Sequence, residues 1–511
     1  MEDLRLKCLA TSESITVYWE KETEWEKGIR YCAFLDKDAA ETVERTHFQW
    51  ENLLPDREYC VRVHCLTAEG KILASGECQV RTAKAKRRLD VRCAPYFAKG
   101  DGKSLNTEAL QRAIDDCSAE DVVYFPQGTF LSGALRLHSN MEIYLEEGAI
   151  LQGSSRVEDY RPKIPSRFEG YEMECYSSLL NMGELNHAGG CSCGNILIHG
   201  KGAILGGGRV LAEAVITSER ERLYAYLETL GAGILEYENA DTIPGRARPR
   251  LVNISNCENV RISGLTLGNG ASWNVHMIYS TGIVTDHCTF YSENVWNGDG
   301  WDPDSSADCT IFACDFFTGD DSIAIKSGKN PEGNRINRPC EGIRIFDCHC
   351  VQGHGFTIGS EMSGGVRDVK IWDCDLSGGR YGIEIKGTKK RGGYVRNVEV
   401  LDCTLPRILF HSVGYNDDGE GALTPPVFED CTFIGIRLLG KFPDKEKRLQ
   451  SCTAIELTGF DVPGYEIRNI WFEKITLPAS QVQTISMQYC KNISFRDLSV
   501  EPEEKGAIEN E

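Results

Sequence analysis

The sequence predicts an all-β protein in which a small antiparallel β-sandwich precedes a long parallel β-helix. Residues 1–85 contain short runs of alternating polar and apolar residues separated by turns, which is typical of a sandwich. From about residue 90 the chain instead repeats a short β-branched strand followed by a turn and a second strand, which is typical of a solenoid. We therefore expect a sandwich at 1–85, a linker at 86–92 and a β-helix domain at 93–505.

The N-terminal module has its clearest strand patterns at residues 14–19 and 59–65. The run 53–63, with Trp19 upstream, resembles a fibronectin type III module. This resemblance implies that Tyr59 closes a corner by hydrogen bonding to nearby backbone. We expect the module to act as a spacer or packing domain rather than to bind sugar, and the basic stretch 84–88 to be a solvated linker.

The repeat is visible as strand starts near residues 259, 282, 309, 342, 368, 397, 469 and 492, mostly about 22–33 residues apart. Because the repeating unit contains strands alone, it favours a parallel β-helix over a helical array. Residues 106–117 have apolar side chains on one face of a helix, so we expect a helix that caps the open first coil.

Two segments interrupt the repeat. Residues 208–235 read as a helical insertion, and residues 411–450 contain a polar, glycine-rich loop. Insertions in a solenoid tend to gather on its binding face.

Composition limits the partners and the location. The chain has 56 Lys and Arg against 76 Asp and Glu, a net charge of −20, so nucleic acid and anionic membranes are not expected partners. The sequence has neither a run of about 18 apolar residues nor a signal-like start, which predicts a cytoplasmic protein unless a signal was removed. The oligomeric state cannot be predicted.

The 22 cysteines are expected to be reduced thiols that pack as small apolar side chains. Residues 191–193 and 348–350 contain closely spaced cysteines, but no paired C-x-x-C occurs. We therefore predict no metal and no cofactor.

Four polar clusters fall on successive repeats, at residues 297–304, 319–322, 353–355 and 385–387. Each alone could be a turn or a solvated corner. Neighbouring strands lie about 4.8 Å apart, so the four together would form a column roughly 15 Å tall, enough for one to three sugar rings. Carboxylates, an imidazole and an ammonium in one column can donate a proton, activate water and hold a substrate carboxylate.

These clusters, with segments 100–103, 125–130 and 360–367, resemble the polygalacturonase family, glycoside hydrolase family 28, which is a right-handed parallel β-helix. The resemblance implies that Asp320 is the general acid of an inverting reaction. It implies that Asp299 and Asp321 orient and deprotonate the attacking water, and that His354 tunes or positions the acid. Predicted substrate-binding residues are Asn297, Lys386, Lys326, Glu384 and Asp302.

The fourth cluster departs from the family pattern. Where the family has Arg-x-Lys, this chain has Glu384-Ile385-Lys386, so an acid replaces a residue that helps to hold a galacturonate carboxylate. A side chain from Lys389, Lys390 or Arg391 could replace it, or the bound sugar could differ from free galacturonate. We also expect repulsion among the three crowded aspartates to raise the pKa of one of them, as an acid needs.

Residues 302–305 and 325–328 resemble the bacterial, exo-acting branch of the family. The leading hypothesis is hydrolysis of α-linked galacturonate from the ends of pectic oligosaccharides, without a cofactor. Alternatives are hydrolysis of a substituted pectin (rhamnogalacturonan or xylogalacturonan), a Ca²⁺-dependent lyase of the pectate-lyase kind, and a non-catalytic glycan-binding solenoid.

Overall fold

The computed structural model describes residues 2–22, 28–38, 41–230, 241–479 and 484–501. The chain divides into two compact units, Met1–Arg88 and Leu89–Glu511. Their boundary falls within the predicted linker 86–92, which here carries strand β9 (Arg87–Asp90).

The first unit contains two β-sheets. Their strands are β1 (Glu2–Asp3), β8 (Ile72–Arg81), β7 (Glu58–Leu66), β4 (Arg30–Leu35) and β5 (Glu41–Val43) in one sheet, and β2 (Lys7–Ala10), β3 (Ile15–Tyr18) and β6 (His47–Trp50) in the other. The pairs are antiparallel except β1 with β8. The core includes Trp19 and Val61, and the Leu54 amide donates a hydrogen bond to the Tyr59 hydroxyl at 3.0 Å. The fibronectin type III resemblance stays a prediction.

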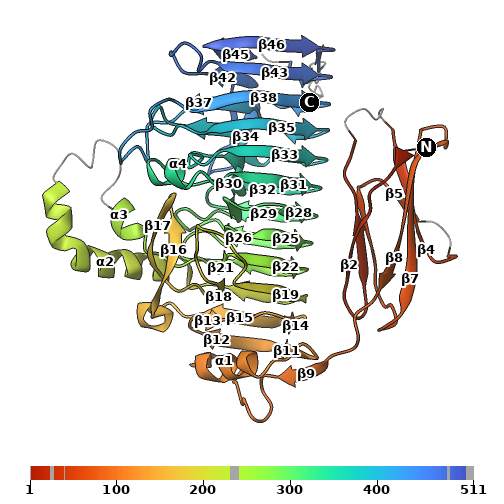
Figure 1. Ribbon diagram of the computed structural model, residues 1–511, viewed down its shortest axis with the longest axis vertical. Coiled ribbons are helices and arrows are strands. Elements are labelled where there is room, and N and C mark those ends of the chain that lie inside the picture. Colours follow the sequence, from red (N-terminus) through yellow and green to blue (C-terminus); the bar gives the residue numbers. More distant parts are fainter. Residues whose placement is uncertain (1, 23–27, 39–40, 231–240, 480–483, 502–511) are drawn as a thin grey trace, which may run out of the picture. The chain divides into compact units, whose positions relative to one another are not determined.

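The second unit is a parallel β-helix, which confirms the predicted fold (Figure 1). Its strands form three parallel ladders. Ladder 1 contains β10 (Asp101–Leu105), β12 (Gly128–Ser132), β15 (Ala149–Gly153), β20 (Ala203–Leu205), β23 (Thr266–Gly268), β26 (Thr289–Ser292), β29 (Asp315–Thr318) and β32 (His349–Ile358). A separate four-stranded sheet contains β36 (Thr404–Leu405), β39 (Arg437–Leu438), β44 (Thr476–Leu477) and β47 (Ser499–Val500).

Ladder 2 carries the polar clusters. It contains β13 (Leu135–Arg136), β18 (Leu180–Gly183), β21 (Val252–Ser255), β24 (Val275–Ile278), β27 (Trp301–Asp304), β30 (Ile323–Ile325), β32, β34 (Gly379–Gly387), β37 (Ile408–Ser412), β42 (Ile455–Thr458) and β45 (Ile485–Gln488). Because the first half of β32 pairs with ladder 1 and its second half with ladder 2, the two ladders join there.

Ladder 3 begins at β9. It continues through β11 (Asp121–Phe125), β14 (Met141–Leu145), β19 (Cys193–Gly200), β22 (Cys257–Ser263), β25 (Thr281–Asp286), β28 (Thr310–Phe312), β31 (Cys340–Phe346), β33 (Val366–Trp372), β35 (Tyr394–Leu401), β38 (Val427–Ile434), β43 (Ile467–Glu473) and β46 (Cys490–Arg496).

The interior of the β-helix is filled by equivalent side chains stacked from coil to coil. Phe290 stacks on Phe316 with ring centroids 4.8 Å apart. A buried column of thiols also runs through successive turns, at Cys288, Cys314, Cys348, Cys374 and Cys403. Such stacking buries apolar surface along the whole solenoid.

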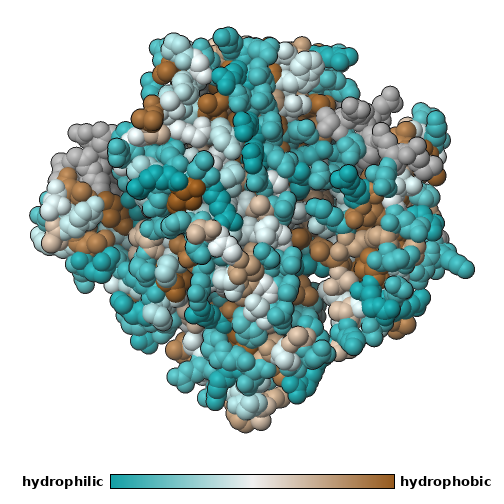
Figure 2. Space-filling view, in the orientation of Figure 1, coloured by the Kyte–Doolittle hydropathy of each residue, from teal (hydrophilic) through white to brown (hydrophobic). Residues whose placement is uncertain are grey.

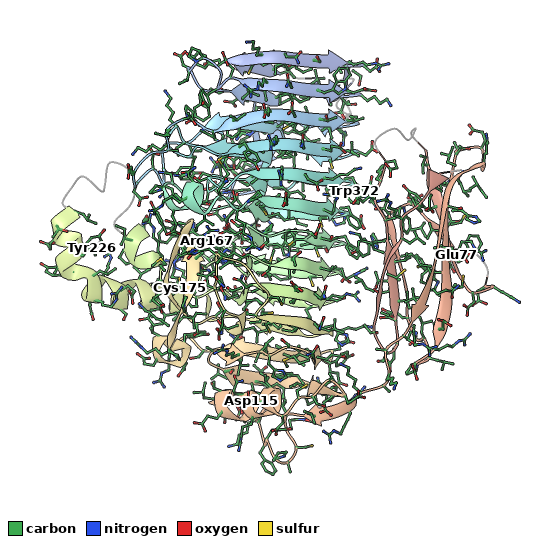
Figure 3. The ribbon with its side chains drawn as sticks, in the orientation of Figure 1. Glu77, Asp115, Arg167, Cys175, Tyr226 and Trp372 are labelled. Carbon is green, nitrogen blue, oxygen red and sulfur yellow. The ribbon has the colours of Figure 1, made fainter. Side chains whose placement is uncertain are left out.

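Helix α1 (Thr107–Asp115) confirms the predicted cap, with Leu110, Ala113 and Ile114 buried. The remaining helices are η1 (Val157–Tyr160), α2 (Gly208–Leu230), α3 (Thr242–Gly245) and α4 (Glu332–Ile336). Helix α2, which carries Tyr226 in Figure 3, confirms the helical insertion, whose last predicted residues, 231–235, lie outside the described residues.

The predicted insertion at 411–450 is wrong in extent. Residues 413–426 form an irregular loop, but β38 returns to ladder 3 at residue 427 because its alternating apolar residues fill the interior. A hairpin of β40 (Lys441–Pro443) and β41 (Leu449–Ser451) follows, and a second unpredicted hairpin pairs β16 (Lys163–Phe168) with β17 (Tyr171–Tyr176).

The molecular face seen in Figure 2 is mostly hydrophilic, with hydrophobic residues scattered over it. Among the described residues, no helix has the length and apolar character needed to cross a bilayer.

Candidate active site

The four polar clusters lie on consecutive strands of ladder 2. The Gly300 amide donates to the Asp321 carbonyl at 3.0 Å, and the His354 amide donates to the Asp320 carbonyl at 2.9 Å. Thr357 lies opposite Glu384 in the pairing of β32 with β34. The structure thus brings together Asp299, Asp320, Asp321, His354 and Lys386, which are far apart in the chain.

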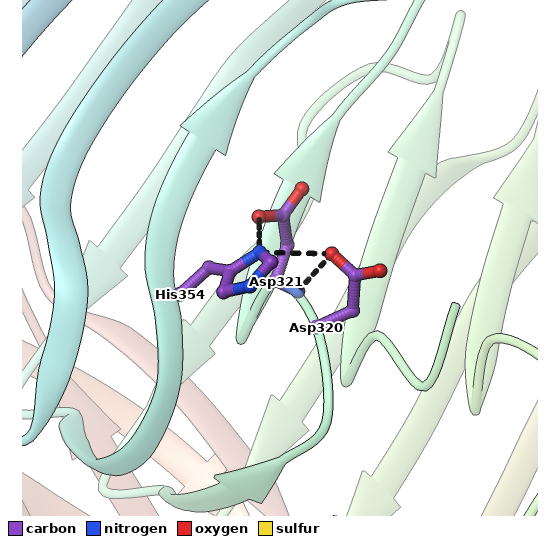
Figure 4. Close-up of side chains that lie close together, drawn as sticks. All are labelled: Asp320, Asp321 and His354. Carbon is purple, nitrogen blue, oxygen red and sulfur yellow. Dashed lines mark hydrogen bonds and ion pairs between the residues drawn. The ribbon is translucent and has the colours of Figure 1, made fainter. Parts of the chain in front are cut away.

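Asp320 and Asp321 share one site because they lie in the bend before β30. On a regular strand their side chains would face opposite ways. His354 Nδ1 lies 3.0 Å from Asp320 Oδ1 and 3.4 Å from Asp321 Oδ1 (Figure 4). The Asp320 and His354 side chains are about a quarter exposed, so both can reach a substrate.

His354 is positioned by its neighbours. Gly353 has φ +144°, and a Cβ at this position would collide with Thr318 Oγ1, so the strand can pass this close to β29 only with glycine. The Tyr381 ring packs edge-on against the His354 ring at 5.1 Å. Burial opposes protonation of His354, but Asp320 and Asp321 outweigh it and raise the pKa to about 10. One proton is therefore held beside Asp320 at neutral pH.

Asp321 is held ionised. Lys386 Nζ lies 3.5 Å from its Oδ2, and the Thr357 hydroxyl donates to its Oδ1 at 2.9 Å. Burial alone would raise the pKa of Asp321, but Lys386 and His354 bring it below the ordinary value for aspartate. A carboxylate kept in this state can accept a proton.

Asp299 lies in the opposite electrostatic environment. Burial, followed by repulsion from Asp302, raises its pKa well above the ordinary value, and burial raises that of Asp302 to about 7. Lys326 Nζ lies 3.4 Å from Asp299, 3.6 Å from Asp302 and 3.5 Å from Glu361. Among the three crowded aspartates, the raised pKa thus falls on Asp299, to which the resemblance gave a role at the attacking water, and burial is its largest cause.

Three predicted substrate-binding residues are buried. The Asp302 side chain is 0% exposed, that of Glu384 2% and that of Lys326 4%. Lys326 pairs with Asp302, and Glu384 pairs with Lys386. The predicted role of these three residues in substrate binding stays a prediction. Asn297 is half-buried and its Oδ1 accepts a bond from Arg248 Nη2 at 2.6 Å.

Sequence reasoning missed four residues around the site. Glu361 pairs with Lys326, His411 Nε2 lies 2.7 Å from Glu384, and the Tyr415 ring lies 5.9 Å from Lys386 Nζ. Arg248 is fully buried and binds Asn297. Glu361 stood within the quoted segment 360–367, whereas His411, Tyr415 and Arg248 lie outside the four clusters.

Two inserted segments, the β16–β17 hairpin and loop 413–426, contact residues beside the stacked clusters. Arg167 of β16, labelled in Figure 3, donates from Nη1 to Asp304 Oδ1 of β27 at 2.8 Å, with both side chains 0% exposed. In the loop 413–426, Asn416 Nδ2 donates to Glu361 at 2.6 Å. Asp418 of the same loop pairs with Arg246 at 3.1 Å and also with Lys329. The hairpin is thus fixed to Asp304, and the loop is fixed to Glu361, which pairs with Lys326.

Asp320, Asp321 and His354 offer ligand atoms within 4.8 Å of one another, which is close enough to hold a metal ion. His354 Nδ1, however, is the atom that contacts both carboxylates. Its raised pKa means that a proton competes with any metal at this nitrogen.

The fold is a parallel β-helix whose ladder 2 stacks acidic residues and His354. The model of the glycosyl hydrolases family 28 matches residues 226–414, and that of rhamnogalacturonase A/epimerase, pectate lyase-like, matches residues 94–150. The residues that carry the stacked clusters thus match a glycosyl hydrolase model, in agreement with the resemblance that the sequence predicted.

Similar proteins extend over most of the chain. A probable polygalacturonase of Vitis vinifera is 29% identical over 80% of this chain and 82% of its own. An exo-poly-alpha-D-galacturonosidase of Dickeya chrysanthemi is 25% identical over 91% and 80%. The family 28 exopolygalacturonase of Yersinia enterocolitica shares the fold with a TM-score of 0.80 over 98% of both chains at 22% identity. A Thermotoga maritima exopolygalacturonase is 25% identical with a TM-score of 0.66 over 81% of this chain and 91% of its own.

Proposed function

We propose that this protein is an inverting, exo-acting glycoside hydrolase that releases α-linked galacturonate units from pectic oligosaccharides. The observation that carries the proposal is the stack of Asp299, Asp320, Asp321 and His354 on consecutive strands of one ladder. The similarity to galacturonosidases and exopolygalacturonases supports the substrate class.

In this mechanism Asp320 donates a proton to the glycosidic oxygen while the bond from that oxygen to the anomeric carbon breaks. A water molecule forms the new bond to the anomeric carbon from the opposite face and gives one proton to the ionised carboxylate of Asp321, while Asp299 orients that water. Ionised Asp321 suits this role, and protonated His354 lies beside Asp320 and positions it. Acid and base on opposite faces invert the anomeric configuration.

The exo-acting mode is supported by the similarity to exo-acting proteins, and two inserted segments are fixed beside the stacked residues. The β16–β17 hairpin is joined to β27 by the buried Arg167–Asp304 pair, and loop 413–426 is joined to Glu361, Arg246 and Lys329.

The direct test is Asp320→Asn. Loss of a general acid reduces turnover by about 10²–10⁴-fold, so kcat on trigalacturonide should fall at least a hundredfold while the circular dichroism spectrum and Tm stay unchanged. Asp315→Asn is the matched control, since Asp315 is half exposed and pairs with His349. Asp320→Asn activity within tenfold of wild type would contradict the proposal. Chromatography of the wild-type products should show release of single units from one terminus.

A further inference from the structure

Lys386 is the lysine shared with the family motif, and two carboxylates of this protein already neutralise its positive charge. Its ammonium lies 3.0 Å from Glu384 Oε2 and 3.5 Å from Asp321 Oδ2, and its side chain is 8% exposed. Lys326 is likewise surrounded by three carboxylates. A substrate carboxylate therefore needs another cation.

Two of the residues suggested as replacements are occupied elsewhere. Lys390 Nζ donates to the Asp417 carbonyl at 2.8 Å. Arg391 is fully buried and binds the Asn416 carbonyl at 2.6 Å and the Ser360 carbonyl at 2.8 Å. Both side chains therefore hold loop 413–426 and neighbouring backbone, and Lys389 is exposed to solvent on the same turn.

A different pair of cations lies next to the catalytic imidazole. The guanidinium carbons of Arg380 and Arg407 lie 5.1 and 4.9 Å from the centre of the Tyr381 ring, and that ring packs against His354. The Phe442 ring of the β40–β41 hairpin lies 5.9 Å from both guanidinium groups.

The positive charge of this pair is only partly compensated. Within the described part of the chain, Arg380 forms no ion pair and is exposed. Arg407 pairs with Glu456 at 3.8 Å, and among the described residues its buried Nε has no hydrogen-bond partner. Both guanidinium groups contact the Tyr381 and Phe442 rings. A bound anion would offset the repulsion between two nearby cations, and guanidinium groups match a carboxylate in shape as well as charge.

We propose that Arg380 and Arg407 form a carboxylate-binding subsite, with Tyr381 as its floor, for a galacturonate unit next to the one being cleaved. This inference rests on the proposed function and extends it, because it assigns the recognition of an acidic sugar to residues that the family motif does not include. Phe442 adds an apolar wall on which a sugar ring can pack.

The test compares Arg380→Gln, Arg407→Gln and the double variant on trigalacturonide and on its methyl ester, which has the same shape without the negative charge. We expect kcat/KM on the free acid to fall about fivefold in each single variant and at least thirtyfold in the double variant. The change on the methyl ester should stay within threefold. Arg396→Gln is the matched control, because Arg396 packs on the Tyr394 ring at 4.3 Å on ladder 3.

Calorimetric binding of both ligands in the Asp320→Asn background measures the same difference without turnover, so it separates failure of the subsite from failure of the proposed function. The double variant should then bind the free acid at least tenfold more weakly and the methyl ester with unchanged affinity. Equal losses for both ligands, or no loss for the free acid, would overturn the assignment. Wild-type protein that binds trigalacturonide but does not cleave it would contradict the proposed function alone.

Discussion

Asp302 is a single residue of the candidate site whose burial lowers the stability of the folded protein. Its carboxylate is completely buried, and among the described residues neither oxygen has a hydrogen-bond partner. Lys326 at 3.6 Å offsets part of this cost. Burial nevertheless dominates and raises the pKa of Asp302 to about 7. Asp302 therefore binds a proton more tightly in the folded chain than in the unfolded chain.

The pH dependence of Asp302→Asn tests this balance. A carboxyl whose pKa is higher in the folded chain than in the unfolded chain, where it is about 3.9, lowers the free energy of unfolding as pH rises between the two values. Asparagine does not ionise, so the variant should gain at least ~1 kcal/mol relative to wild type between pH 4 and pH 8. Urea unfolding at both pH values measures the gain. A stability difference that is independent of pH would show that Asp302 does not titrate as described.

Among the strands, β32 positions His354 of the candidate site. Its first half pairs with ladder 1 and its second half with ladder 2, and Gly353 lies where the register shifts. The same strand therefore bends at the point where His354 must turn towards Asp320. An inserted segment is also fixed to the site, because Asn416 of loop 413–426 donates a hydrogen bond to Glu361.

Gly353→Ala tests the importance of the bend. A methyl group would collide with Thr318 and force the backbone away from β29, and alanine also disfavours the positive φ. We expect kcat/KM to fall at least tenfold and the free energy of unfolding to drop by about 1–3 kcal/mol. Gly414→Ala is the control, because a Cβ at Gly414 meets no atom within 4 Å. Full activity of Gly353→Ala would show that His354 is not positioned by this bend.

At the scale of the whole molecule, the repeat in the sequence predicted the architecture because each coil repeats the same strand and turn chemistry. The spacing of Asp299, Asp320, His354 and Lys386 was near one coil, so their stacking also followed from periodicity. The cap helix was predictable from one apolar face that ends at Cys117.

Other features could not follow from periodicity. His411, Tyr415 and Arg248 reach the site from neighbouring coils or from an insertion, where no motif marks them. The raised pKa of Asp299 depends on burial beside Asp302, which spacing alone does not give. The β16–β17 hairpin and the end of the loop at residue 426 depend on which segments pair with a neighbouring coil, as β38 does with β35.

The net charge of −20 also belongs to this scale. A strongly negative protein that acts on an acidic oligosaccharide must concentrate positive charge locally. The Arg380 and Arg407 pair provides such a concentration beside His354. The fibronectin type III resemblance, the roles of individual residues and the cytoplasmic location stay predictions.

The most direct test of the central claim is the proton NMR spectrum of trigalacturonide recorded during the first minutes of digestion by the wild-type protein. Hydrolysis at the stacked carboxylates predicts that the newly released anomeric centre appears first as the β form and then equilibrates with the α form. First appearance of the α form would contradict an inverting site. An unsaturated product that absorbs ultraviolet light, and that EDTA abolishes, would show a metal-dependent lyase instead.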